Sequence, residues 1–240
     1  VDENGKDYWP ADVHVIGKGI NWFHSVIWPG ILLSASIKLP KKLLVHGYLN
    51  FKGQKISKSL GNTIDPIELA DKYGSDSVRY SLLRNSVFED SDYNEEILIT
   101  RHNNELANKF GNLVSRVFSL AEKNGVSKCD NKLLKKLKLK EINRLIDSFE
   151  LDKAVNEIFG FIDVCNEYIQ SNKPWETNDK KVLYELVDSI KAIGILLWPF
   201  MPSASEKILN QLNVKINYDE IKKPLIVGKI KKGEILFGKI

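Results

Sequence analysis

The chain has 240 residues, 43% of them hydrophobic and 28% charged, a composition that excludes an intrinsically disordered protein. A formal net charge of +4 is too small to indicate nucleic-acid binding by itself. Cys129 and Cys165 lie far apart, with no His or Cys at metal-ligand spacing, so we expect reduced, structural thiols. No signal peptide is expected, and the apolar run at residues 194–201 is too short to cross a bilayer. We therefore expect a cytoplasmic protein without a membrane partner.

The first predicted elements are a strand, a helix and a second strand. Residues 13–16 form a short apolar run before Gly17, residues 20–35 have a helical pattern, and residues 43–49 form the second apolar run. This order predicts one right-handed crossover of a parallel sheet. Ligands bind beyond the carboxyl ends of such strands, which here are Gly17 and His46. Two strands and one helix leave sheet surface uncovered, so we expect further polypeptide to pack here.

A short loop with two lysines and two serines follows, bracketed by Gly53 and Gly61. Ammonium groups on flexible stems follow phosphate charge as it moves, and glycine lets the backbone approach phosphate oxygens closely. The same composition is also typical of an ordinary solvated loop. From composition alone, both interpretations stay open.

Two helices are predicted after this loop. Asp65 with Pro66 and Glu68 forms a capping box that begins the first helix. Gly74 ends that helix, and Ser75 is predicted to cap the second one. Two arginines of the second helix, Arg79 and Arg84, are candidates either for contacts to an RNA backbone or for surface ion pairs.

From residue 94 onward the pattern is helical. Apolar residues recur at three and four between residues 106 and 121, and Gly125 is predicted to end that helix. Further helices are expected at about 152–171, 178–197 and 203–212, which together indicate a helix bundle. The lysine-rich stretch 128–140 is interpreted as a solvated connector or helix face, with direct RNA contact as the alternative.

The loop sequence Lys-Ile-Ser-Lys-Ser at residues 55–59 resembles the Lys-Met-Ser-Lys-Ser signature of class I aminoacyl-tRNA synthetases. The flanking motifs resemble the methionyl-tRNA synthetase family, in its bacterial form, in order and spacing. These motifs are Val-His-Val-Ile-Gly-Lys (13–18), Trp-Phe-His (22–24), Trp-Pro (28–29), Val-His-Gly-Tyr (45–48), Asn-Thr-Ile-Asp-Pro (62–66), Tyr-Gly-Ser-Asp-Ser-Val-Arg-Tyr (73–80), Asn-Leu-Val-Ser-Arg (112–116) and Lys-Pro-Trp (173–175). The resemblance covers nearly the whole chain.

The resemblance implies an α/β fold followed by an all-α fold. We expect a partial Rossmann-like nucleotide-binding half at residues 1–60 that ends in the lysine loop, and a stem-contact linker at 61–93. A helix-bundle anticodon-binding domain is expected at 94–215, and a tail at 216–240 that folds back toward the catalytic side. The family's His-Ile-Gly-His signature has no counterpart in this chain. An N-terminal catalytic half, either a separate subunit or a missing part of the same enzyme, is therefore an expected partner.

The resemblance also implies a reaction and its site residues. The family activates L-methionine with ATP and Mg²⁺ and transfers it to methionine tRNA; no zinc site is expected in this chain. The residues expected for catalysis are Lys55, Ser57, Lys58 and Ser59. Those expected for ATP binding are Gly17, His46, Gly47, Leu49, Lys55 and Lys58. Those expected for methionine binding are Ile20, Phe23, His24 and Trp28. Those expected for anticodon binding are Asn112, Arg116 and Trp175.

One position departs from the family pattern. The family has an acidic residue after Ile-Gly-Lys, which would accept hydrogen bonds from ribose hydroxyls, and this chain has Gly19. Beside a methionine-tRNA ligase two alternatives stay open, the second of them suggested by this departure and by the missing catalytic half. One is a class I synthetase for another aliphatic amino acid, and the other is a non-catalytic tRNA-binding fragment.

Overall fold

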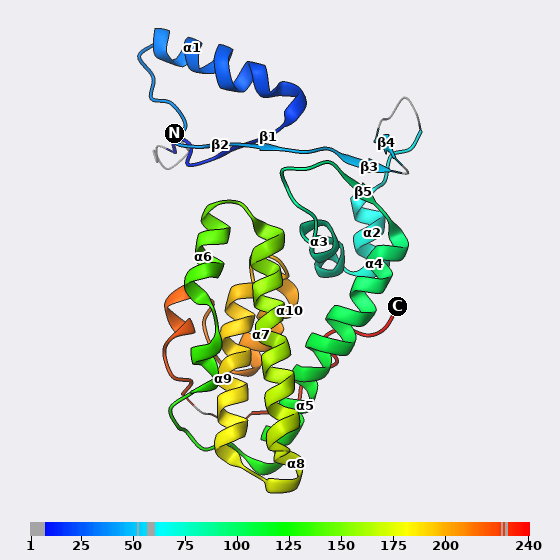
Figure 1. Ribbon diagram of the computed structural model, residues 1–240, viewed down its shortest axis with the longest axis vertical. Helices are drawn as coiled ribbons and strands as arrows, with labels where there is room; N and C mark the ends of the chain where they lie inside the picture. The colour runs from blue at the N-terminus through cyan, green and yellow to red at the C-terminus, as the bar shows by residue number, and fades with distance from the viewer. Residues whose placement is uncertain (1–7, 52, 57–60, 227, 229) are drawn as a thin grey trace. The chain divides into compact units, whose positions relative to one another are not determined.

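The computed structural model divides the chain into two compact units, drawn as a ribbon in Figure 1. The first unit comprises residues 1–63 and 85–93, and the second comprises 64–84 and 94–240. The residues whose structure is described are 8–51, 53–56, 61–226, 228 and 230–240.

The first unit contains two small sheets and one helical segment. Its elements are β1 (His14–Gly17), η1 (Lys18–Ile20), η2 (Phe23–Ile27), α1 (Trp28–Ser34), β2 (Leu43–His46), β3 (Leu49–Phe51), β4 (Gln54–Lys55) and β5 (Ser91–Tyr93). Strands β1 and β2 pair in parallel, with Gly17 opposite His46. The predicted strand-helix-strand crossover is confirmed. In the other sheet β3 lies between β4, which is antiparallel to it, and β5, which is parallel to it.

The prediction of one continuous strand over residues 43–49 is wrong. Strand β2 ends at His46, and the chain then turns into β3 of the second sheet. The Gly47 amide donates to the carbonyl of Val87 over 2.9 Å, and the carbonyl of Tyr48 accepts from the Ser91 amide over 3.0 Å. The backbone at this point therefore pairs with residues far along the chain instead of continuing beside β1.

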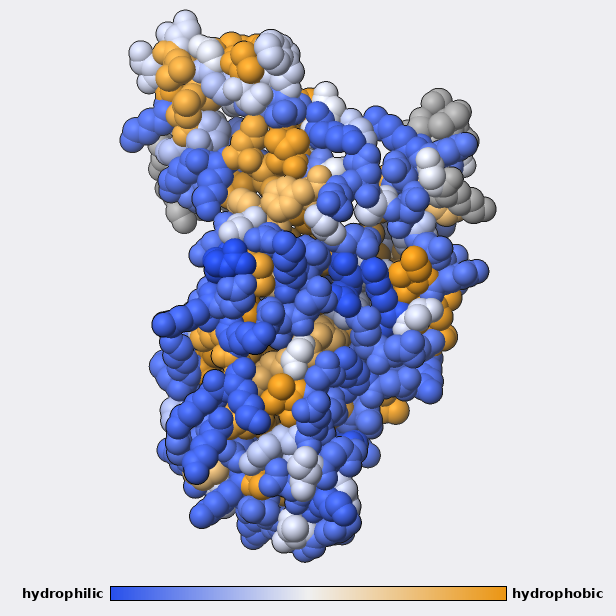
Figure 2. Space-filling view, viewed as in Figure 1, coloured by the Kyte–Doolittle hydropathy of each residue, from blue (hydrophilic) through white to orange (hydrophobic). Residues whose placement is uncertain are grey.

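The predicted helix at residues 20–35 is helical throughout but changes its winding. It starts as the 3₁₀ turn η1, widens to the π-helix η2, and continues as α1. Within η1, η2 and α1 only Leu32 is buried. Large apolar side chains of this segment are exposed, and Figure 2 shows apolar atoms gathered on the first unit.

The second unit is helical. Its elements are α2 (Pro66–Tyr73), α3 (Ser75–Leu83), α4 (Glu95–Arg101), η4 (His102–Gly111), α5 (Asn112–Asn124), η5 (Leu133–Lys136), α6 (Leu139–Asp147), α7 (Leu151–Asn172), α8 (Pro174–Thr177), α9 (Lys180–Leu197), α10 (Pro202–Gln211) and η6 (Tyr218–Ile221). Helices α5, α7 and α9 pack side by side around a continuous apolar core (Figure 1). The predicted helix bundle is confirmed.

Several helix ends follow the predicted local chemistry. The Asp65 carboxylate accepts from the Ile67 amide over 2.8 Å and caps α2, as the capping box predicts. Gly74 and Gly125 end their helices with φ of +82° and +71°, conformations that favour glycine. The prediction that Ser75 caps α3 is wrong, because Gly74 occupies the cap position and no side chain caps that helix.

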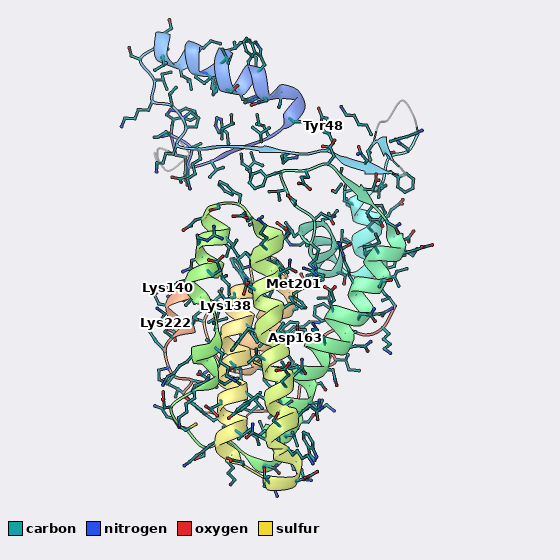
Figure 3. The ribbon with its side chains drawn as sticks, viewed as in Figure 1. Tyr48, Lys138, Lys140, Asp163, Met201 and Lys222 are labelled. Atoms are coloured by element: carbon teal, nitrogen blue, oxygen red, sulfur yellow. The ribbon has the colours of Figure 1, made fainter. Side chains whose placement is uncertain are left out.

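The stretch 128–140 is more than a solvated connector. It contains η5 and the start of α6, and Leu133 is buried in the bundle core. The exposed Lys138 forms an ion pair with the half-buried Glu157, with 3.0 Å between nitrogen and oxygen. Figure 3 shows Lys138, Lys140 and Lys222 on the same side of the helical unit. One face of this stretch therefore packs on the bundle while its lysines face water.

The C-terminal residues run over η4 of the second unit. The buried His102 ring contacts the Ser77 hydroxyl through Nδ1 at 2.8 Å and the carbonyl of Gly238 through Nε2 at 2.5 Å. Asn103 and Ile240 exchange a pair of hydrogen bonds. Within the described ranges, the structure contains no helix with the length and apolar content needed to span a bilayer.

Candidate nucleotide and RNA sites

The first candidate site lies at the carboxyl ends of β1 and β2. Because the strands are parallel and Gly17 is in register with His46, both ends open at the same edge of the sheet. The His46 ring donates from Nδ1 to the carbonyl of Gly47 over 2.7 Å, which fixes the ring at the end of β2. The structure thus brings together three of the residues predicted to bind ATP.

Gly47 is enclosed by backbone from a distant segment. A Cβ at this position would lie 2.2 Å from the carbonyl oxygen of Glu89 and 2.8 Å from the amide of Asp90. Neither backbone atom is able to yield as a flexible side chain does, so only glycine fits between them. The segment that precedes β5 is thereby held against the end of β2.

Asp90 joins the two strand ends. One carboxylate oxygen accepts from the Tyr48 amide over 2.8 Å, and the other accepts from the Lys18 ammonium over 2.7 Å. The hydrogen bond from Lys18, with that from the Tyr48 amide, holds the pKa of Asp90 below its ordinary value. The carboxylate is therefore ionised at neutral pH and serves as counter-charge to Lys18.

Two lysine ammonium groups lie over the ring of Tyr48. Nζ of Lys18 lies 4.9 Å from the ring centroid, and Nζ of Lys55 lies 4.3 Å from it. Both distances are within the range of a cation–π interaction. Figure 3 shows Tyr48 in the segment between the two sheets of the first unit.

Gly19, the departure from the family pattern, lies against the same tyrosine. A Cβ at residue 19 would lie 2.2 Å from the Tyr48 hydroxyl oxygen. In this arrangement the phenol occupies the space where any side chain of residue 19 would begin. The glycine at residue 19 therefore leaves the space that the Tyr48 hydroxyl occupies.

The lysine loop is described only at its edges. Lys55 belongs to β4 and is exposed, and its carbonyl accepts from the Asn62 side chain over 3.2 Å. Leu49, another residue predicted to bind ATP, is half-buried in β3. The predicted catalytic residues Ser57, Lys58 and Ser59 lie outside the described residues.

The residues predicted to bind methionine lie on successive helical turns of η1, η2 and α1. Nδ1 of His24 is 3.1 Å from the carbonyl oxygen of Ile20, and the rings of His24 and Phe23 meet edge to face at 5.3 Å. Trp28 follows one turn later and is half-buried, whereas Ile20 and Phe23 are 52% and 46% exposed. The four residues lie on one segment, where Ile20 and Phe23 are exposed and His24 and Trp28 are half-buried.

The second candidate site lies on the helical unit. Arg116 of α5 places its guanidinium carbon 5.5 Å from the ring of Trp175, which belongs to α8. Asn112, one turn before Arg116, is exposed. Trp175 is reached after α7 ends and Lys173 adopts a left-handed conformation with φ of 42°. The structure therefore joins Arg116 to Trp175 and places Asn112 on the same helix.

Two other predicted RNA candidates hold the protein together. Arg79 donates to the carbonyls of Phe200 and Pro199 over 3.0 Å and 2.7 Å. Arg84 pairs with Glu105, with 3.2 Å between nitrogen and oxygen. The structure therefore favours the ion-pair alternative for Arg84, whereas Arg79 makes intramolecular hydrogen bonds that neither alternative described.

Sequence reasoning missed two residues of the first site. Lys18 was visible only as part of a motif, and its position directly after β1 is the signal that identifies it. Asp90 carries no local signal, because it lies 42 residues from Tyr48, whose amide it binds. Among the described residues, no group of His, Cys, Asp and Glu side chains converges as a metal site would require.

The sequence matches two protein-family models. Residues 1–118 match the family of class I tRNA synthetases designated M, and residues 130–231 match the anticodon-binding domain of tRNA ligases. Together they span the first unit and most of the helical bundle. The first candidate site lies within the first match, whereas the second combines Asn112 and Arg116 of the first match with Trp175 of the second.

Several relatives are similar over most or all of the chain. A methionine-tRNA ligase of Caldanaerobacter subterraneus subsp. tengcongensis is 39% identical over the whole chain, and one of Rickettsia conorii is 42% identical over 88% of it. The chain spans 41% and 46% of these relatives. A Mycobacterium tuberculosis methionyl-tRNA synthetase in complex with methionyl-adenylate superposes with a TM-score of 0.89 at 32% identity, covering 98% of this chain and 52% of that one. The chain thus spans about half the length of the relatives it matches.

Proposed function

Because the chain belongs to the methionyl-tRNA synthetase family, we propose that it forms one half of a methionine-tRNA ligase. The observation that carries the proposal is the edge where β1 and β2 end together, beside the ammonium groups of Lys18 and Lys55. Such an edge is where parallel sheets bind nucleotides. We assign residues 1–60 to catalysis, 61–93 to the stem-contact linker, 94–215 to anticodon binding and 216–240 to the closing tail.

The first step is formation of methionyl-adenylate. A carboxylate oxygen of methionine attacks the α-phosphorus of ATP, and the bond from that phosphorus to its bridging oxygen breaks as pyrophosphate leaves with the electron pair. Lys55 and Lys58 neutralise charge that builds on the phosphates in the transition state. Ser57 and Ser59 donate hydrogen bonds to the same oxygens or support the loop. Mg²⁺ enters with ATP as part of the substrate.

The second step transfers the methionyl group to a ribose hydroxyl of the terminal adenosine of methionine tRNA, with AMP as leaving group. Ile20, Phe23, His24 and Trp28 are assigned to the methionine pocket. Arg116 and Asn112 read unstacked anticodon bases at their edges, and Trp175 stacks on a base face. The contact between Arg116 and Trp175 supports this assignment. We place the ligase in the cytoplasm, where translation consumes its product.

The exposed apolar face of the first unit supports an N-terminal catalytic half as partner. Trp22, Ile31 and Leu33 are 70%, 50% and 63% exposed. Parallel sheets are stable when both faces are covered, and large exposed apolar patches mark interaction surfaces. The partner would cover this face and complete the methionine pocket.

The face is tested by co-purification. Ile31→Asp should abolish capture of the N-terminal half by this chain, because a carboxylate would have to be buried in the interface. Ile226→Asp, at a position 87% exposed in the second unit, is the control that should retain capture. Equal capture by both variants would show that the partner does not use this face.

The activity is tested by methionine-dependent exchange of pyrophosphate into ATP. The chain is combined with an N-terminal half, and Lys55→Met and Lys58→Met are compared with the unsubstituted complex. Each substitution should lower kcat by about 10²- to 10³-fold, the usual effect of removing one group that stabilises transition-state charge. Full exchange activity in both variants would overturn the assigned chemistry.

A non-catalytic tRNA-binding protein is the second candidate, and Gly19 is the observation that favours it. Without a carboxylate at residue 19, one expected acceptor for ribose hydroxyls is missing. An assembled complex that binds methionine tRNA but catalyses no exchange with any amino acid would establish this candidate in place of the ligase. Exchange with another aliphatic amino acid and not with methionine would instead identify a different specificity.

A further inference from the structure

We propose that Lys18 is an additional phosphate-binding residue of the nucleotide site, held beside Lys55 by the ring of Tyr48 and by Asp90 until the anion arrives. This inference rests on the proposed function, because it concerns the phosphates of the same nucleotide. It starts from the geometry of four side chains, of which only Lys55 belongs to the signature loop.

The first argument is the charge of the cluster. Two ammonium groups lie within 5 Å of one ring centroid, and among the described residues one carboxylate, that of Asp90, contacts them directly. A cation–π contact at an exposed site contributes only about 0.5–1 kcal/mol. That contribution offsets the repulsion between like charges only in part, so the described cluster keeps a surplus positive charge. An anion of high charge density is the ligand that would neutralise it.

The second argument is the position of Lys18. It follows Gly17 directly, at the edge of the sheet where nucleotide phosphates are expected. Its side chain is 47% exposed and that of Asp90 is 41% exposed, so both are accessible to a ligand. An ion pair of such exposure contributes little to folding, typically below about 1 kcal/mol. Stabilisation of the fold by this ion pair is therefore too small to account for the position of Lys18 at the edge of the sheet.

The third argument is how firmly Tyr48 is seated. Its amide is fixed by Asp90, the adjoining Gly47 is enclosed by the backbone of residues 89 and 90, and its hydroxyl occupies the space left by Gly19. With the backbone fixed at residues 47 and 48, the ring lies within cation–π distance of both ammonium groups. Tyr48 is thus a positioning residue, and Lys18 and Lys55 are the groups that would contact phosphate.

The arrangement predicts opposite effects for the two partners of the ion pair. When ATP binds, Lys18 exchanges the Asp90 carboxylate for phosphate oxygens. Removing the ammonium weakens ATP binding, whereas removing the competing negative charge does not. Asp90→Asn keeps an oxygen that accepts from the Tyr48 amide, so it removes the charge without removing that support.

The experiment compares pyrophosphate exchange by the assembled ligase for Lys18→Met, Lys18→Arg and Asp90→Asn. Lys18→Met should raise the KM for ATP about tenfold or more, as expected for loss of a charge-assisted hydrogen bond, with an unchanged KM for methionine. Lys18→Arg should return the KM to within about threefold of the unsubstituted value, since it retains the charge. Asp90→Asn should leave the KM for ATP equal or lower. Lys41→Met, which removes an exposed lysine paired with Asp12 in the same unit, is the control.

The inference is overturned if Lys18→Met stays within twofold of the unsubstituted ligase, or if Asp90→Asn raises the KM as much as Lys18→Met does. It is also overturned if Lys41→Met has the same effect, because any lysine would then suffice. Absence of exchange in the unsubstituted complex would overturn the proposed function instead. Calorimetric binding of tripolyphosphate to the 240-residue chain then decides the inference by itself: about tenfold weaker binding to Lys18→Met supports it, and equal binding overturns it.

Discussion

Tyr48 links two segments that lie apart in the sequence, residues 18–19 and residue 55. Its ring contacts the ammonium groups of Lys18 and Lys55, and its hydroxyl stands where a side chain of Gly19 would begin. The glycine at residue 19 is therefore linked to the position of Tyr48, because any side chain at residue 19 would require the phenol of Tyr48 to move. Residues 19 and 48 are expected to behave as a coupled pair.

We expect Gly19→Ala to weaken ATP binding by the assembled ligase, since the added methyl group displaces the Tyr48 hydroxyl. In a Tyr48→Leu background the same substitution should have no further effect. The coupling between the two positions should be about 1 kcal/mol, as for residues in direct contact. A double-mutant cycle of the KM for ATP measures it, and additive effects would contradict the coupling.

Trp175 belongs to the proposed RNA site and not to the proposed nucleotide site. Trp175→Ala should weaken tRNA charging by about 1–3 kcal/mol in kcat/KM, the value of one base stacked on an aromatic ring. Pyrophosphate exchange should not change, because that reaction needs no tRNA. Trp198→Ala is a matched control, since Trp198 is 40% exposed in the same unit and Trp175 is 39% exposed. A parallel fall of both reactions would show that Trp175 acts on folding and not on RNA.

At the scale of elements, short-range signals predicted the helix ends well and the helix type poorly. Asp65, Gly74 and Gly125 act through contacts within a few residues, so the sequence shows them directly. The π-helices η2 and η4 depend on packing of the whole segment, and a helical apolar pattern does not distinguish them from α-helix. The end of β2 depends on residues 87–91, which no local pattern connects to Gly47.

Helix α10 has its N-terminus capped from another helix. The buried carboxylate of Asp76, on α3, accepts from the amides of Ser203 and Ala204 over 3.3 Å and 2.7 Å. No side chain at the cap position of α10 does so. The side chain that caps α10 thus comes from a residue that lies 127 positions before Ser203 in the sequence.

Asp76→Ala should lower the free energy of unfolding by about 1–2 kcal/mol, the upper range for loss of a helix cap. Asp71→Ala is the control, because Asp71 is exposed on α2. Urea denaturation followed by circular dichroism measures both variants. Equal stability of the two would mean that Asp76 contributes no capping.

At the scale of the whole molecule, the buried core is distributed unevenly. Nearly all of the fully buried apolar side chains belong to the second unit, among them Leu106, Ile158 and Leu197. In the first unit Ile16, Leu32 and Leu44 are buried, while large apolar side chains such as Trp22 and Leu33 are exposed. The sequence predicted this difference, because one crossover supplies too few layers to bury a parallel sheet.

We therefore expect residues 64–240 to fold without residues 1–63. The shortened chain should keep its helical circular dichroism and bind the anticodon stem-loop of methionine tRNA within about threefold of the affinity of the full chain, because the residues proposed to read bases all belong to the second unit. Fluorescence anisotropy at fixed salt measures the affinity. Loss of cooperative unfolding in the shortened chain would contradict the autonomy of this unit.

The hydrogen bonds from α3 to the start of α10 and to the two residues at 199 and 200 have a mechanical consequence. Asp76 holds the first amides of α10, and Arg79, less than one turn later, holds the carbonyls of the two residues at 199 and 200. Tension applied to the chain where it leaves α3 is therefore transmitted to α10 through one carboxylate and one guanidinium. In a force-extension measurement, α3 and α10 should therefore unfold together in a single event.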